Sequence, residues 1–457
     1  MKILLVQPAR PEKAMSIEDF EIFEPLALEY LAAGVAGEHD VRILDMRLEK
    51  NLDFMLNDYR PDVVGITSYT VHVNTVTKLF KRIKGFNPEI YTVIGGHHAT
   101  VIPEDFFSPD IDAIIQGEGV FSFRELINRL ERKKGFSDIP GVVRIENGTR
   151  GILIKEENKM PDLDAIPFPD RKLTTPYRSS YSSAWMKPIA SIRTSKGCIY
   201  KCTFCALWKL TGGRYLVRKP EHILEELGAI EESNIFFADD ESLLDTDRME
   251  TLADMIMRSG IKKRYFLYGR SDTIAGHPEL IERWRKIGLE RVFVGLEFFK
   301  DADLKAVRKG TTAEKNAEAL RILKSLDIDI YPVFMIKPEF ERKDFSDLRK
   351  YCLKLELDFI GFSVLTPLPG TDFYEDVREK MITSNYDYFD FIHTQIRTKL
   401  PLNDFFRELA DLYKNSRSLK NQIKYLRKFP VRELPHLISA NSAFMKRLKT
   451  LANDYNV

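Results

Sequence analysis

Short runs of apolar residues, each followed by a turn or a helical stretch, recur along the first third of the chain. They predict buried strands, because they are brief and rich in Val, Ile and Leu. These runs are residues 2–8, 40–46, 61–67, 91–96 and 111–119. Between them, residues 74–86 carry apolar positions at helical spacing. The alternation predicts a doubly wound parallel sheet, the Rossmann-like form of an α/β domain, in residues 1–139.

A second series of strand and helix patterns occupies residues 185–375. Its strand patterns are residues 234–240, 264–270, 291–297, 328–336 and 357–370. Its amphipathic helix patterns are residues 221–230, 278–289 and 312–326. Parallel strands joined by helices close into barrels, and the loops at the strand carboxyl ends carry the site. We therefore expect a partial (β/α)6 barrel whose ligands bind at those ends.

Different patterns mark the segments before and after the predicted barrel. Residues 140–184 predict a β-hairpin around ENGTRG, followed by a proline-punctuated linker. Residues 376–457 predict a third, mostly helical unit, which includes the helical pattern at 402–416.

The overall charge is almost balanced, with 69 basic and 68 acidic residues. This balance gives no reason to expect nucleic acid or a membrane surface as the main partner. No run approaches the ~18 apolar residues of a spanning helix, and the apolar ILLV near the start is too short for a signal peptide. The four cysteines do not resemble a secreted disulfide framework. We therefore expect a cytoplasmic protein without a transmembrane segment.

One segment departs from this balance. Residues 414–449 contain ten Lys or Arg and a single Glu, interleaved with apolar residues. Two interpretations stay open: a solvated helical face that balances acids elsewhere, or a docking site for an acidic partner or a lipid surface.

Three of the four cysteines, Cys198, Cys202 and Cys205, lie within the stretch SKGCIYKCTFCALW. Structural zinc normally takes two separated pairs of ligands, and the second pair is missing here. Three incidental buried cysteines are also disfavoured in so short and mixed a segment. A [4Fe–4S] cluster held by three thiolates leaves one iron open to an external molecule. Cys352 stands alone in a helical pattern, which favours a small buried hydrophobe.

The spacing C-x3-C-x2-C, with Phe204 before the last cysteine, resembles the signature of radical S-adenosylmethionine enzymes. The resemblance implies that S-adenosylmethionine chelates the open iron and is cleaved to a 5′-deoxyadenosyl radical by an electron from an external low-potential donor. It also implies roles for polar strand ends: Asp239 and Asp240 toward the methionine amino group, Arg270 toward the carboxylate, and Glu297 toward amino or ribose groups. The implied S-adenosylmethionine contacts are Phe204, Asp239, Asp240, Arg270, Glu297 and Pro367.

The stretches VGITSYT, VIGGHHAT and DAIIQGEGVFSFREL resemble the cobalamin-binding domain that is fused to many radical enzymes. Neither a dinucleotide fingerprint nor a P-loop is present. The implied cobalamin contacts are Gln7, Pro8, Ser68, Tyr69, Thr70, Val71, Gly95, Gly96, His97, Gly117, Glu118 and Gly119.

Arg47 stands where free-standing cobalamin domains carry the histidine that ligates cobalt. We therefore expect cobalamin to bind without a histidine ligand. The lower face of cobalt then meets Tyr69, Thr70 or Val71, while His72 is a solvated or structural residue. His97 and His98 are expected to touch the corrin or its nucleotide tail.

The stretches RWRKIGLERVFVGLE, TPLPGT and TKLPLNDFFREL resemble hopanoid C-3 methylases, within the cobalamin-dependent radical S-adenosylmethionine methyltransferases. The same layout resembles the enzymes that C-methylate residues of methyl-coenzyme M reductase. The resemblance implies transfer of a methyl group from S-adenosylmethionine, through methylcobalamin, to an unactivated sp3 carbon after hydrogen abstraction.

Several substrates and activities fit this resemblance. We expect a protein side chain as the substrate, because the basic tail departs from the lipid-methylase pattern and suits an acidic partner. A polycyclic lipid is the alternative substrate. A radical cyclase or C–C coupling enzyme, as in porphyrin-ring cyclases, and a cobalamin-sensing or carrier protein are the other hypotheses.

Overall fold

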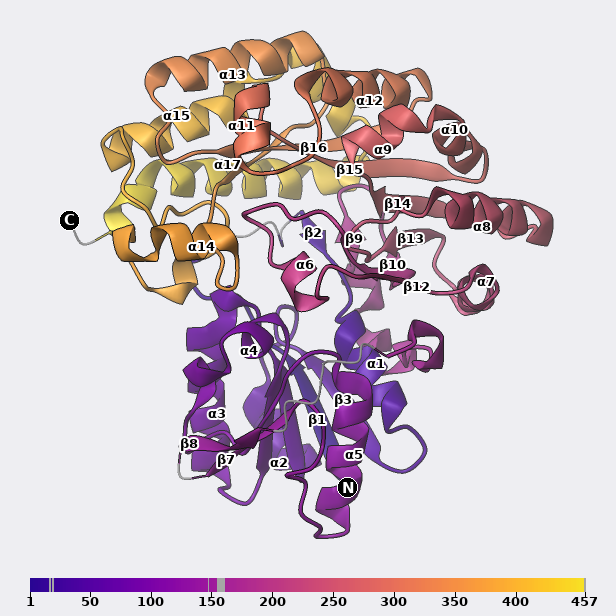
Figure 1. The fold of residues 1–457 in the computed structure, drawn as a ribbon, viewed down its shortest axis with the longest axis vertical. Coiled ribbons are helices and arrows are strands. Elements are labelled where there is room, and N and C mark those ends of the chain that lie inside the picture. Colours follow the sequence, from indigo (N-terminus) through magenta and orange to yellow (C-terminus); the bar gives the residue numbers. More distant parts are fainter. Residues whose placement is uncertain (16–17, 19, 147, 154–160, 456–457) are drawn as a thin grey trace.

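The computed structural model describes the chain except residues 16–17, 19, 147, 154–160 and 456–457. Figure 1 shows two α/β units, one above the other: the indigo and purple N-terminal unit below, and the magenta to orange unit above. The yellow C-terminal helices pack beside the upper unit. None of the helices in the described residues combines the length and apolar character needed to cross a membrane.

The lower unit is built on a seven-stranded sheet in the order β3-β1-β4-β5-β6-β7-β8. Its parallel strands are β1 (Lys2–Gln7), β3 (Asp40–Asp45), β4 (Val63–Thr67), β5 (Tyr91–Gly95) and β6 (Ala113–Ile115). In β1, Ile3 and Leu5 face one layer of helices, while Leu4 and Val6 face the other. Burial on both faces explains why these strands are continuous apolar runs. The expected doubly wound sheet is confirmed.

Helices cover both faces of this sheet. α1 (Leu26–Gly34) and α5 (Gly119–Glu131) pack on one face, and α2 (Leu52–Tyr59) and α3 (Val73–Phe86) pack on the other. The hairpin expected before the linker is formed by β7 (Val142–Glu146) and β8 (Thr149–Leu153). β7 pairs antiparallel with β6, so the hairpin extends this sheet instead of standing apart from it.

The upper unit is a six-stranded parallel sheet that forms the partial barrel. Its strands, in spatial order, are β10 (Ile189–Ile192), β13 (Asn234–Phe237), β14 (Arg264–Tyr268), β15 (Leu289–Glu297), β16 (Asp329–Ile336) and β17 (Gly361–Val364). Four of these strands lie within the segments predicted from the sequence, β15 begins two residues before its predicted segment, and β10 was not predicted. Outer helices include α7 (Pro220–Ala229), α8 (Thr246–Ser259), α10 (Pro278–Lys286), α12 (Ala313–Ser325) and α13 (Arg342–Leu355).

The C-terminal helices share the hydrophobic core of the barrel. They are α15 (Leu402–Asn415), α16 (Leu419–Leu426) and α17 (Leu434–Thr450). Phe405, Phe406 and Leu409 of α15 belong to the same buried cluster as Phe345 of α13 and Phe362 of β17. The third unit expected from the sequence is therefore helical, and its packing continues that of the barrel.

A buried arginine ties distant segments together at the end of the barrel where the strands begin. Arg291 of β15 is 1% exposed and forms ion pairs with Glu21 at 3.2 Å and Asp329 at 3.1 Å. It also donates a hydrogen bond to Ser183 Oγ at 2.8 Å. Lys428, which follows α16, pairs with Asp329 from the other side. The N-terminal segment, the barrel and the tail thus meet in one charge network.

Replacing Arg291 with Met should destabilise the barrel strongly. The change leaves Glu21 buried without its cation, and removing one partner of a buried ion pair costs about 3–5 kcal/mol. Urea unfolding followed by tryptophan fluorescence measures the loss. The matched control is Arg283→Met, since Arg283 pairs with Asp254 where both side chains are 41% exposed. That control should cost less than about 1 kcal/mol. Equal effects of the two variants would contradict the role of the network.

Candidate functional site

The three clustered cysteines lie in a loop that a small antiparallel hairpin holds in place. β11 (Ser195–Gly197) pairs with β12 (Tyr215–Val217), and the cysteine loop and α6 (Leu207–Leu210) connect them. Gly197 has a φ of 93°, and a Cβ atom there would lie 2.2 Å from the carbonyl oxygen of Arg214. Only glycine therefore permits this start of the loop.

All three cysteines of the loop are free thiols, with Cys202 buried and the other two half-buried. Burial raises the pKa of each thiol, to about 12 for Cys205. Among the residues that the structure describes, no three His, Cys, Asp or Glu side chains converge on a point that one metal ion could occupy. In an iron–sulfur cluster each thiolate binds its own iron, so such cysteines stand apart from one another.

Asp239 and Asp240 follow β13 and have different surroundings. The carboxylate of Asp239 accepts hydrogen bonds from Thr194 N at 2.7 Å, Thr194 Oγ1 at 2.6 Å and Ser195 N at 2.8 Å. Its Oδ1 therefore holds the backbone that leads into β11, and its Oδ2 holds the Thr194 hydroxyl. Asp240 accepts from Gly197 N at 2.6 Å and also lines the large cavity described below. Of the two, Asp240 is the one that reaches this cavity.

Arg270, directly after β14, is held against the cysteine loop. Its guanidinium carbon lies 3.4 Å from the ring centroid of Tyr200, which stands between Cys198 and Cys202. It binds Asp272 through Nε at 2.9 Å and Nη2 at 3.1 Å. The arrangement fixes a cation beside the cysteines, with Tyr200 as the contact between them.

Two buried residues next to these strand ends were missed from the sequence. Lys309 donates to Glu297 Oε1 at 2.7 Å, and each residue is 8% exposed. Glu241 is 4% exposed, and burial raises its pKa to about 7, although Arg270 and Lys309 lower it. Neither Lys309 nor Glu241 ends an apolar run in the sequence, so no local pattern indicated them. Their burial beside Arg270 identifies them as candidate site residues.

Phe204 and Pro367 lie on the apolar side of the same region. Phe204 packs against a buried cluster that contains Phe298, Val307 and Leu365. Pro367 is buried shortly after β17. Their surroundings are those of a hydrophobic support for the loop.

A cavity of about 520 Å³ lies where the carboxyl ends of both sheets meet. Among the predicted cobalamin contacts, those on its wall are Gln7, Tyr69, Gly95, Gly96, His97, Gly117, Glu118 and Gly119. The barrel contributes Arg193, Lys196 and Asp240 to the same wall. Pro8, Ser68, Thr70 and Val71, also predicted to contact cobalamin, are not among its lining residues.

Glycines after the strands form one side of this cavity, termed the glycine floor. Gly96 has a φ of 102°, and a Cβ atom there would lie 2.8 Å from the backbone nitrogen and oxygen of Ser68. Tyr69 is 52% exposed, and its ring meets that of His97 edge-on with centroids 5.1 Å apart. A floor of backbone with one open aromatic ring fits a large planar macrocycle such as a corrin.

The neighbouring histidines and Arg47 are already engaged or buried. His98 binds Thr70 Oγ1 at 3.1 Å and Asp105 at 2.8 Å and is not among the residues that line the cavity, so its contact with the corrin or its nucleotide tail stays a prediction. His72 is 7% exposed, and burial lowers its pKa to about 4. Arg47 lines the cavity and binds Asp45 through Nε at 2.8 Å.

Glu118 joins the two units across the cavity. This residue of the lower unit accepts from Arg193 Nη1 at 3.1 Å and from Lys196 Nζ at 2.8 Å, both in the upper unit. Lys196 belongs to β11, directly before the cysteine loop. The ion pairs therefore connect the glycine floor to the cysteines.

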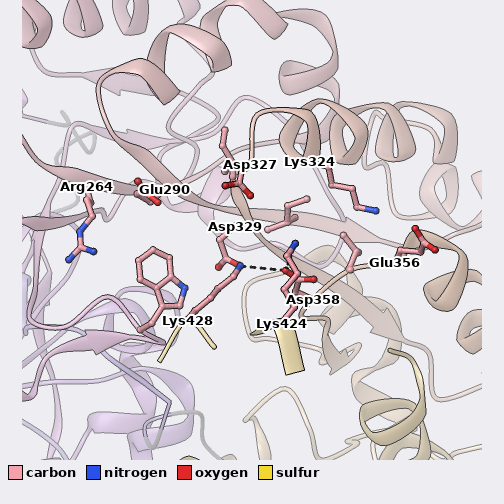
Figure 2. A pocket seen from close by; sticks show the side chains of 13 residues that line it. Arg264, Glu290, Lys324, Asp327, Asp329, Glu356, Asp358, Lys424 and Lys428 are labelled. Carbon is pink, nitrogen blue, oxygen red and sulfur yellow. Dashed lines mark hydrogen bonds and ion pairs between the residues drawn. The ribbon is translucent and has the colours of Figure 1, made fainter. Parts of the chain in front are cut away.

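A second cavity, of about 590 Å³, lies at the opposite end of the barrel strands (Figure 2). Its wall carries acids and bases together, including Asp329, Asp358, Lys424 and Lys428. Lys424 binds Asp358 at 3.0 Å, and Lys428 pairs with both aspartates. None of the predicted site residues lines this cavity. Two cations of the basic tail thus balance acids of the barrel.

Comparison with known proteins agrees with this geometry. A family model described as B12 binding domain matches residues 14–127, and the Radical SAM superfamily model matches residues 192–352. The hopanoid C-3 methylase of Methylococcus capsulatus is 32% identical over 420 residues, which cover 90% of this chain and 79% of that protein.

Two more distant proteins extend the likeness. Bacteriochlorophyllide d C-12(1)-methyltransferase of Chlorobaculum tepidum is 25% identical, over 92% of this chain and 89% of that protein. The solved structure of the cobalamin-dependent radical enzyme OxsB, with aqua-cobalamin and S-adenosylmethionine bound, aligns with a TM-score of 0.72. It is 18% identical and covers 97% of this chain and 71% of that chain, so it shows a shared fold. The chain belongs to the cobalamin-dependent radical S-adenosylmethionine methyltransferases, enzymes that use a [4Fe–4S] cluster, S-adenosylmethionine and cobalamin.

Proposed function

We propose that this enzyme C-methylates an unactivated sp3 carbon of a polycyclic lipid. When bound, its cofactors supply a radical that removes a hydrogen atom from carbon and a methyl group that takes its place. The chain's own residues bind these groups, fix their separation and exclude water.

The cysteine loop and the adjoining strand ends are the proposed seat of the cluster and S-adenosylmethionine. Cys198, Cys202 and Cys205 hold the cluster. Asp240, Arg270 and the Glu297–Lys309 pair surround the cofactor with charges of both signs, which suit its amino and carboxylate groups. Asp239 acts as a positioning residue, because its carboxylate already anchors the backbone before the loop.

The glycine floor is the proposed cobalamin site, with Tyr69 beneath the ring. His98, bound to Thr70 and Asp105, and His72, which is off the cavity wall, would not reach cobalt, and His97 is the one of these three histidines that lines the cavity. The ion pairs of Glu118 link the two proposed cofactor-binding loops and would limit how far these loops can move apart.

The substrate proposal rests on a row of aromatic rings inside the barrel, termed the aromatic wall. It consists of Phe236, Tyr268, Phe293 and Tyr331, one from each of four neighbouring strands. Successive ring centroids lie 5.2, 4.7 and 5.2 Å apart. These rings form a cluster separate from the one beneath the outer helices. Phe23, on the wall of the large cavity, stacks on Phe236 at 4.3 Å and connects the cavity to this wall.

Such a wall suits a rigid apolar ring system, which packs on aromatic faces and needs few hydrogen bonds. The similar hopanoid C-3 methylase of Methylococcus capsulatus supports a lipid of this kind. A protein side chain, expected from the basic tail, stays a prediction. Its docking argument used Lys424, Arg427 and Lys428, and two of these cations, Lys424 and Lys428, pair with barrel acids.

The substrate is tested anaerobically with reconstituted enzyme, a low-potential reductant and methyl-labelled S-adenosylmethionine. Label should enter a hopanoid and 5′-deoxyadenosine should form. Label in a protein or peptide, with none in the hopanoid, would establish the protein substrate instead. Deoxyadenosine together with an unlabelled, newly cyclised product would indicate a cyclase.

Phe293→Ala should lower methylation of the hopanoid by about 10–100-fold, because it removes the centre of the aromatic wall. Cleavage of S-adenosylmethionine without substrate should persist, since the rings that Phe293 packs against, Tyr268 and Tyr331, are not predicted cofactor contacts. Phe54→Ala is the control, as Phe54 is 60% exposed on the lower unit. Unchanged methylation by the Phe293 variant would contradict the substrate site.

Replacing Cys198, Cys202 or Cys205 with Ala should abolish cluster binding, because each thiolate holds one iron. Cys352→Ala is the matched control, since Cys352 is 1% exposed within the hydrophobic core of the barrel. Iron content and the visible absorption of the reconstituted protein report the cluster. Equal iron loss in the Cys352 variant would replace the three-cysteine site with a four-cysteine one.

Reconstituted protein should retain about one cobalamin per chain, without a nitrogen ligand to cobalt. Gly96→Ala should weaken retention, because its Cβ atom would displace the loop at Ser68. His72→Ala should leave the electron paramagnetic resonance spectrum of the cobalt(II) form unchanged. Nitrogen splitting that disappears in the His72 variant would overturn the assignment of the lower face.

A further inference from the structure

We propose that α16 and the segment after it form a docking surface for an anionic lipid bilayer. The surface, termed the tail face, combines exposed aliphatic side chains with unpaired cations. Its members are Leu419, Lys420, Ile423, Leu426, Arg427, Val431, Arg432 and Ile438. The inference concerns a surface far from the cysteine loop and stands on its own contacts, whatever substrate the enzyme methylates.

Aliphatic residues of the tail face are unusually exposed. Leu419 is 71% exposed, Val431 81% and Ile438 60%. Ile423 and Leu426 are 43% and 37% exposed. Leu419, Ile423 and Leu426 follow one another at intervals of four and three, so they form one stripe along α16. An exposed apolar stripe of this kind along a helix marks an interaction surface.

Cations border this stripe. Lys420 and Arg427 lie one position after Leu419 and Leu426, and Arg432 directly follows Val431. Within the part of the chain that the structure describes, these three cations make no ion pair, unlike Lys424 and Lys428. Lys424 and Lys428 of the tail therefore pair with barrel acids, whereas Lys420, Arg427 and Arg432 lie beside exposed aliphatic side chains.

The inner side of α16 is firmly attached to the barrel. Tyr425 stacks on Phe359 with ring centroids 5.2 Å apart, and Asn421 Nδ2 donates to Leu357 O at 3.2 Å. Lys428 pairs with Asp329 at the base of the barrel. Because these contacts fix the helix, its outer stripe is held outward and cannot fold back into the core.

Several features favour a bilayer over a protein as the occupant. Protein interfaces concentrate aromatic anchors and are depleted in Lys, whereas the exposed stripe is aliphatic and bordered by cations. Aliphatic residues that enter the acyl boundary, beside Lys or Arg that meet anionic headgroups, are the pattern of interfacial helices. The charge of the tail face complements phosphatidylglycerol.

Vesicle flotation with the full-length reconstituted enzyme tests the proposal. The probes are vesicles of phosphatidylcholine alone and of phosphatidylcholine with phosphatidylglycerol, both without polycyclic lipid. Binding to the anionic vesicles should exceed binding to the neutral ones and weaken as salt rises. Equal binding to both, or no binding to either, would overturn the proposal.

Two sets of variants locate the surface. The triple change Lys420→Glu, Arg427→Glu and Arg432→Glu should lower anionic-vesicle binding by about 100-fold or more, given the usual contribution of each basic residue at a charged membrane. The changes Leu419→Ser, Ile423→Ser and Val431→Ser should lower it by at least about 10-fold. The matched control reverses Arg132, Lys133 and Lys134, which are exposed on the lower unit. An equal loss in this control would contradict the tail face.

Two further measurements distinguish membrane docking from misfolding and from self-association. Methylation of detergent-dispersed substrate should be unchanged in the tail-face variants, so loss of vesicle binding is not loss of folding. Sedimentation should show the same oligomeric state for the variants and the parent enzyme. A change in oligomeric state would instead assign the tail face to a second copy of the chain.

Discussion

The ion pairs of Glu118 with Arg193 and Lys196 are the contact on which the geometry of the site depends. They cross the boundary between two units that each fold around a separate hydrophobic core. Despite burial, the two cations hold the pKa of Glu118 below its ordinary value, so the carboxylate is charged at neutral pH. A radical reaction tolerates little error in the separation of its groups. A buried charge pair sets that separation more firmly than an apolar contact, which permits sliding.

Much of the fold was accessible from the sequence because its strands are buried on both faces. Continuous apolar runs identified the parallel strands of the lower sheet and five strands of the barrel. β10 was missed because Ala and Ser interrupt its apolar pattern, IASI, whereas β13 and β17, also four residues long, lie in longer apolar runs. The hairpin was recognised from its turn, but its place on the edge of the sheet depends on pairing with β6, which local sequence does not encode.

In the candidate site too, some residues could be predicted from local sequence, whereas others depend on tertiary contacts. Cysteine spacing and glycines after strands are local signals, and they led directly to the loop and the cavity floor. Lys309 and Glu241 carry no local signal, since their importance comes from burial beside Arg270. Local sequence also gives no sign that His98 binds Asp105, which lies in a later turn. The composition of the tail likewise does not indicate which of its cations pair with barrel acids and which face the solvent.

The charge network around Arg291 has a consequence for synthesis on the ribosome. The sheet of the lower unit is complete by residue 153, so this unit can fold while the chain is still growing. Arg291 has its partners Glu21 and Asp329 by residue 329, but Lys428 reaches Asp329 only about a hundred residues later. Until then Asp329 lacks one of the two cations that pair with it in the finished fold. The nascent barrel therefore passes through a long interval in which chaperones and proteases have access to it, while the cobalamin-binding unit is already protected.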